Sequence, residues 1–133
     1  MPLTYRIDHD RRLITVTPRG ALLLADMIEY QREVWTRPDL VGYDELIDMN
    51  EVAEIEANLP DRMRQLAALS AAMDPVTGPS RMAIVAVQDY HYGLGRMYKA
   101  LREDSLKSTK AIGIFRTYEA ATQWLGGARQ ESR

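Results

Sequence analysis

The stretch that decides the fold is Met82-Ala-Ile-Val-Ala-Val87, followed directly by Gln88-Asp-Tyr-His-Tyr-Gly-Leu-Gly-Arg-Met-Tyr-Lys-Ala-Leu101. Its first part is the longest unbroken apolar run in the chain and predicts a buried central strand. Its second part changes to helical spacing, with a core stripe predicted at Leu94, Met97, Tyr98 and Leu101. We therefore expect a central strand that runs straight into an amphipathic helix.

The sequence on either side of this stretch alternates between strand and helix signals. Apolar and polar residues alternate over 3–7 and 13–17, and the short polar link between them predicts a β-hairpin. The remaining expected elements are a helix over 21–35, a strand over 43–49, an acidic loop over 50–57, a helix over 59–73, a breaker-rich connection over 74–80, a strand over 111–115 and a helix over 118–125 ended by Gly126 and Gly127.

The resulting order, β-β-α-β-α-β-α-β-α, indicates an α/β fold. Continuous apolar strands separated by amphipathic helices predict a mixed, mostly parallel five-stranded sheet with an N-terminal hairpin, covered by helices. With 133 residues the chain has the length of a single domain. We place its core over about 3–126 and a tail over 127–133.

Composition excludes several classes of function. The chain has no cysteine, so disulfides, thiolate nucleophiles and zinc–thiolate sites are ruled out. No signal peptide or membrane-spanning run is expected, and we predict a cytoplasmic protein. The pI of about 5.7 and the lack of a basic stripe argue against nucleic-acid binding. Acidic residues gather in the first half and basic residues in the second, which fits either a homodimer or two halves that interleave in one fold.

The expected topology also predicts where a site would lie. In parallel sheets, ligands bind beyond the carboxyl ends of the strands. Here those ends are 48–58, 88–96 and 116–117, so the acidic loop and the Tyr/His/Gly segment should share one edge of the sheet.

Candidate catalytic groups are few. His9 is expected in a solvated hairpin turn, whereas His91 next to Asp89 has the composition of a general base. No serine stands in a nucleophile motif, so we predict no catalytic residue and favour a surface or interface role for His91. The carboxylates do not follow a calcium-loop pattern, and no histidine pair has ligand spacing, so no metal or cofactor is expected.

Two further features each have two interpretations. Gly93-Leu94-Gly95 lacks the rest of a nucleotide-binding loop, so it indicates a tight turn or close helix packing. Alternatively, the start of a helix beside Arg96 could attract an anion. The seven methionines indicate core filling or, alternatively, an adaptable hydrophobic groove.

Three segments resemble the SpoIIAA-like family, which is related to STAS domains and to Sec14-type lipid-binding domains. They are Leu46-Ile-Asp-Met-Asn-Glu-Val52, Tyr92-Gly-Leu-Gly-Arg-Met-Tyr98 and Ile114-Phe-Arg-Thr-Tyr-Glu-Ala-Ala-Thr-Gln-Trp-Leu-Gly126. The resemblance covers roughly residues 3–126. It implies a non-enzymatic regulatory module that binds a protein partner, or alternatively a carrier of a lipid or small hydrophobic or anionic ligand.

One departure from the resemblance concerns phosphorylation. Kinase-regulated STAS antagonists carry a serine or threonine after the third strand, whereas this chain has Glu56-Ala57-Asn58-Leu59 there and no hydroxyl. A phosphorylation switch of that type is therefore not expected. The partner or ligand site is predicted to include Glu56, Asn58, Asp89, Tyr90, His91 and Arg96. A carrier would in addition have an apolar cleft between the helices at 59–73 and 90–103.

Overall fold

The computed structural model describes residues 3–56, 60–103 and 110–131, with side chains described as far as residue 126. Its elements are β1 (Leu3–Asp8), β2 (Leu13–Pro18), β3 (Gly20–Leu22), α1 (Leu24–Tyr30), a π-helical turn (Gln31–Trp35), a 3-10 turn (Pro38–Leu40), β4 (Asp44–Asp48), β5 (Val52–Ile55), α2 (Pro60–Ala72), α3 (Asp74–Thr77), β6 (Ser80–Val85), α4 (Asp89–Glu103), β7 (Lys110–Phe115) and α5 (Tyr118–Glu131).

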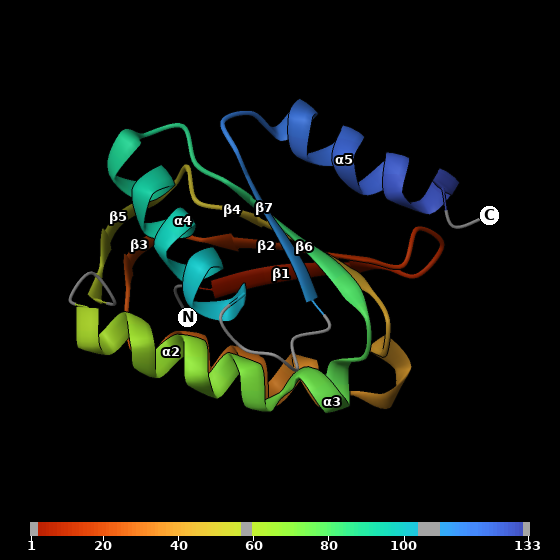
Figure 1. The fold of residues 1–133 in the computed structure, drawn as a ribbon, viewed down its shortest axis with the longest axis horizontal. Helices are drawn as coiled ribbons and strands as arrows, with labels where there is room; N and C mark the ends of the chain where they lie inside the picture. The colour runs from red at the N-terminus through yellow and green to blue at the C-terminus, as the bar shows by residue number, and fades with distance from the viewer. Residues whose placement is uncertain (1–2, 57–59, 104–109, 132–133) are drawn as a thin grey trace.

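The main sheet has five strands in the order β1-β2-β4-β6-β7. β1 and β2 pair antiparallel as the predicted hairpin, and the β2–β4, β4–β6 and β6–β7 pairs are parallel. In Figure 1, α5 lies apart from the other helices, while α2 and α4 lie side by side. The predicted mixed, mostly parallel sheet covered by helices is confirmed.

Strand β6 illustrates why this sequence forms the centre of the sheet. Successive strand residues point to opposite faces. Met82 and Ile84 belong to the larger core, together with α1, α2 and α4, whereas Ala83 and Val85 belong to a smaller core against α5. A strand buried on both faces needs an unbroken apolar run, as this one has.

Two segments differ from expectation because they form a second, two-stranded sheet. β3 pairs in parallel with β5, where we expected the start of a helix and an acidic loop. The strand signal of β5 is weak because it has four residues and one of them is an acid: Glu54 is exposed, while Val52 and Ile55 are buried. Gly20, at a φ of 66°, lets the chain turn from β2 into this small sheet.

Helix boundaries also differ in places. α5 continues to Glu131, so the predicted stop at Gly126 is wrong. A glycine cap requires the left-handed conformation, and Gly126 does not adopt it. Thr117 caps this helix at its start, since its Oγ1 accepts a hydrogen bond from the Ala120 N–H at 3.1 Å. The connection over 74–80 contains the short helix α3. Met97, predicted to be in the core, is 38% exposed.

Candidate functional site

A half-open cavity of about 110 Å³ is lined by residues of the larger core, between the sheet and the helices α1, α2 and α4. Almost every element of that layer contributes to its wall, from Leu3 in β1 to Tyr98 in α4. None of the described lining residues is an aspartate, glutamate, lysine or arginine. Its position between α2 and α4 matches the cleft expected of a ligand carrier.

Four of the methionines that the structure describes line this cavity: Met27, Met49, Met63 and Met82. The thioether side chain is unbranched and changes rotamer easily, so it can adapt to guests of different shape. These four methionines therefore belong to or pack against the core and also line the cavity.

His91 lies at the start of α4 and lines the cavity. It is only 3% exposed, and its ring centroid lies 6.0 Å from that of Tyr90. No hydrogen bond joins its imidazole to any other residue that the structure describes. We expected a surface or interface role for His91, but the structure buries it against apolar neighbours instead.

At the other end of the cavity, two aromatic residues form hydrogen bonds to one buried carboxylate. Trp35 Nε1 donates to Glu45 Oε2 at 2.8 Å, and the Tyr30 hydroxyl donates to the same oxygen. Burial, followed by the negative charge of Glu45, raises the pKa of Tyr30 well above its ordinary value. The phenol consequently remains a donor.

A second polar group lies next to this carboxylate, on α3 and α4. Arg102 pairs with Asp74 at 2.5 Å and donates to the Tyr98 hydroxyl at 2.7 Å. Both members of the ion pair are fully or almost fully buried. Burial raises the pKa of Tyr98, although the charge of Arg102 opposes that shift. Gln31, which also lines the cavity, donates to Ser70 Oγ at 2.8 Å.

The carboxyl edge of the sheet is held together by contacts between its loops. Asn50 Oδ1 accepts from the Val87 N–H at 3.3 Å. Arg116 donates to the Val87 carbonyl at 2.9 Å and to Asp89 at 2.7 Å, and its guanidinium lies 4.0 Å from the centroid of the Tyr92 ring. Over the described residues, the 48–56, 88–96 and 116–117 segments therefore lie at one edge of the sheet, as predicted for them.

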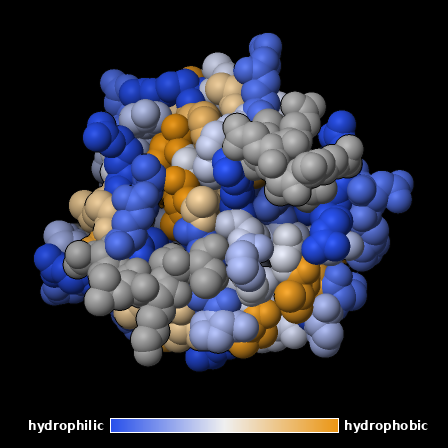
Figure 2. Space-filling view, turned by 45° about the vertical axis from the view of Figure 1, so that its right-hand side comes forward, coloured by the Kyte–Doolittle hydropathy of each residue, from blue (hydrophilic) through white to orange (hydrophobic). Residues whose placement is uncertain are grey.

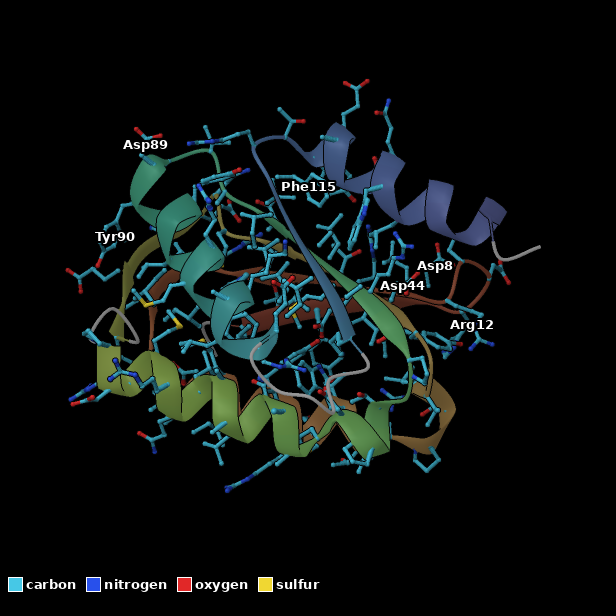
Figure 3. All side chains as sticks on the ribbon, in the orientation of Figure 1. Asp8, Arg12, Asp44, Asp89, Tyr90 and Phe115 are labelled. Atoms are coloured by element: carbon cyan, nitrogen blue, oxygen red, sulfur yellow. The ribbon has the colours of Figure 1, made fainter. Side chains whose placement is uncertain are left out.

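The predicted site residues do not form one cluster. Asp89 and Tyr90 lie at the start of α4, with Tyr90 pointing outward, 54% exposed (Figure 3). Arg96 is exposed on the same helix, and Glu56 pairs with Arg62 at 2.8 Å. His91 points inward. Asn58 lies outside the described residues, as do Ala57 and Leu59, so the position of the usual phosphorylated residue is not described.

Sequence reasoning missed most of the cavity. It identified His91 but not the aromatic and methionine residues of the wall, which are spread over the chain and become neighbours only through the topology. It also missed Arg116, the cation that pairs with Asp89. On the face drawn in Figure 2, hydrophobic residues form small patches separated by hydrophilic ones.

Over the described ranges, no group of three or more acidic or histidine side chains is arranged to hold a metal ion. Within the same ranges, no helix is both long and apolar enough to cross a lipid bilayer.

Solved structures that share this architecture include the following two. One is an uncharacterized protein of the DUF3478 family with a SpoIIAA-like fold from Shewanella loihica PV-4, at a TM-score of 0.58 and 14% identity, covering 92% of this chain and 91% of that one. The other is the anti-sigma factor antagonist SpoIIAA in its unphosphorylated form, at a TM-score of 0.53 and 10% identity, covering 94% and 98%. No family model and no curated protein matches the sequence. The chain thus has a SpoIIAA-like fold, as its sequence motifs indicated.

Proposed function

We propose that this protein binds a small hydrophobic molecule in the cavity between the sheet and helices α2 and α4. The observation that carries the proposal is a half-open apolar cavity of about 110 Å³ lined by residues of the larger core. Protein interiors are normally packed as densely as organic crystals, with few voids larger than a water molecule. An apolar void of about 150 Å³ can take up benzene, so the volume fits a guest of about that size.

The composition of the wall supports an adaptable fit. Met63 on α2 and Met82 on β6 are buried, and Met27 and Met49 are half-buried. The wall can move to admit a longer guest because these side chains are the most flexible apolar ones. Drug-sized ligands need pockets of about 300 Å³ or more, so we propose ligands well below that size.

A pair of matched variants tests this proposal. Leu66→Phe places a larger side chain in the cavity wall on α2, and Leu69→Phe makes the same change three residues on, at a position outside the wall. Calorimetric titration with 1-hexanol should show binding to the wild type and to Leu69→Phe, and at least about tenfold weaker binding to Leu66→Phe. Equal affinity in all three proteins, or no binding to the wild type, would contradict the proposal.

Native mass spectrometry of protein isolated from cells gives an independent measurement. We expect a fraction of the protein to carry a small adduct that is released on unfolding and is absent from Leu66→Phe. An adduct equally abundant in Leu66→Phe would place the ligand elsewhere.

We further propose, as a second function, that the carboxyl edge of the sheet binds a protein partner without catalysing a reaction. Val87 and Tyr90, which are 58% and 54% exposed, support this, together with the exposed Arg96. The name of the second structural neighbour, an anti-sigma factor antagonist, refers to regulation of another protein.

Tyr90→Ala combined with Arg96→Ala should abolish the recovery of specific partners in pull-down assays. Tyr118→Ala, an exposed tyrosine on α5, serves as the control. Unchanged recovery with the double variant would count against this surface.

A further inference from the structure

His91 is the polar group of the cavity that stands without a partner among the described residues. The other polar side chains in the wall of this apolar space have one: Tyr30 and Trp35 donate to Glu45, Tyr98 accepts from Arg102, and Gln31 donates to Ser70. His91 is 3% exposed, yet no described residue forms a hydrogen bond with its ring. The ring nitrogens of His91 are therefore available to a ligand, since no described side chain or backbone group uses them.

The surroundings of His91 favour an anion over a cation. Its imidazole carries a ring N–H that no described residue uses, and none of the described lining residues carries a carboxylate. The ring also lies in the first turn of the 15-residue helix α4, where the peptide dipoles give a positive potential. Asp89, the acid in that turn, is exposed and paired with Arg116 at 2.7 Å.

The cavity extends from His91 towards an apolar interior. His91 and Tyr98 both line it and are two turns apart on α4, which corresponds to about 10 Å along the helix. Leu94 lies between them on the same face, and Leu66 and Ile84 contribute to the wall from α2 and β6. A guest with one polar end and a short apolar chain matches this distribution of groups.

We propose that the natural ligand is a small monocarboxylic acid whose carboxylate accepts a hydrogen bond from His91 and whose apolar part occupies the cavity. This inference rests on the proposed ligand-binding function and specifies its chemistry. A hydrogen bond to an ionised group is worth about 1.5–3 kcal/mol, which corresponds to roughly a tenfold or larger gain in affinity.

Three probes of equal chain length test the inference: hexanoate, 1-hexanol and hexylammonium. Isothermal titration of the wild type at pH 7 should give hexanoate the highest affinity, about tenfold above 1-hexanol, and hexylammonium the lowest. In His91→Leu, hexanoate should lose that advantage while 1-hexanol still binds. In His91→Gln, which keeps an N–H donor, part of the advantage should return.

The outcomes separate the two proposals. Equal affinity of the wild type for hexanoate and 1-hexanol, or an unchanged hexanoate preference in folded His91→Leu, would overturn the role of His91 and leave the apolar cavity function standing. Absence of binding by all three probes would overturn both. If His91→Leu fails to fold, the ranking of the three probes on the wild type and on His91→Gln still decides the question.

Discussion

The buried polar side chains at the two ends of the cavity differ in their hydrogen-bond partners. At the end near β4 and α3, Tyr30 and Trp35 share the Glu45 carboxylate, and Tyr98 is bonded to an arginine that pairs with Asp74. At the end near the carboxyl edge of the sheet, His91 is equally buried but has no hydrogen-bond partner among the described residues. At the first end the side chains hold one another, which indicates a structural role, although Glu45 Oε1, Asp74 Oδ2 and Arg102 Nε have no partner among the described residues. At the second end the ring nitrogens of His91 are not used by any described residue, and we assign the binding role to that end.

The largest expected effect on the free energy of unfolding comes from removing the Arg102–Asp74 ion pair at the paired end of the cavity. Arg102→Met removes the cation and leaves Asp74 buried without its counter-charge. Breaking such a pair from one side costs about 3–5 kcal/mol. Urea unfolding should show a loss of stability of that size. Arg64→Met, which removes an exposed pair with Asp61, is the control and should unfold at the wild-type urea concentration. A small effect of Arg102→Met would mean that the pair is not structural.

Tyr30→Phe is the next largest change. It removes one of the two donors to Glu45 and should lower the free energy of unfolding by about 1–3 kcal/mol at pH 7. Circular dichroism during urea unfolding measures this. A neutral result would contradict the structural role of the Tyr30–Glu45 contact.

The same variant should change the response to alkaline pH. The pKa of Tyr30 is raised in the folded state, so its contribution to stability is complete below the ordinary tyrosine pKa of about 10 and is lost as the pH rises beyond it. Burial lowers the pKa of Lys110 in the folded state, so the Lys110 contribution makes stability rise with pH. That rise ends at the ordinary lysine pKa of about 10.4. Above pH 10.5 the free energy of unfolding should fall with pH more steeply in the wild type than in Tyr30→Phe. The two slopes should differ by up to about 1.4 kcal/mol per pH unit.

Substitution of His91, at the unpaired end of the cavity, should increase stability, whereas the changes at the paired end decrease it. His91→Leu replaces a buried group that lacks a partner with an apolar one, and should raise the free energy of unfolding by about 1 kcal/mol in the absence of ligand. His91→Gln keeps an unpaired polar group and should give no such gain. Thermal and urea unfolding of both variants measure this difference. A clear loss of stability in His91→Leu would show that the imidazole has a structural partner.

The smallest effect compares two glycines of α4 on either side of Leu94. A Cβ at Gly93 meets no atom within 4 Å, so Gly93→Ala should stabilise the helix by about 0.5–1 kcal/mol. A Cβ at Gly95 lies 3.2 Å from Ile114 Cδ1, so Gly95→Ala should gain less or lose stability. Equal gains in the two variants would show that α4 packs less closely on β7 than this distance indicates.

The sequence was sufficient for the main sheet because its signals are local. The run at 82–87 and the alternation in the first hairpin each lie within a few residues, and so does the switch to helical spacing after residue 88. The β3–β5 pair escaped prediction because strands of three and four residues are too short to show a periodicity, and β5 also carries the exposed Glu54. The end of α5 was misjudged because a glycine pair was interpreted as a stop signal.

The candidate site was predictable only in part, for a physical reason. His91 could be singled out by its residue type and by its place after a buried strand. Its burial could not be, because that depends on Met49, Leu66 and other residues that are distant in sequence. The cavity is a property of how β-strands and helices pack, and no single segment encodes it.

The most direct measurement uses the fact that the chain contains two histidines, His9 and His91. In protein labelled with ¹⁵N-histidine, the His91 ring resonances should shift on addition of hexanoate. Those of exposed His9, which is hydrogen-bonded to the Tyr43 hydroxyl at 2.8 Å, should not. If hexanoate binds and the His91 ring signals remain unchanged, the carboxylate does not lie at His91, and the unpaired end of the cavity is not the binding site.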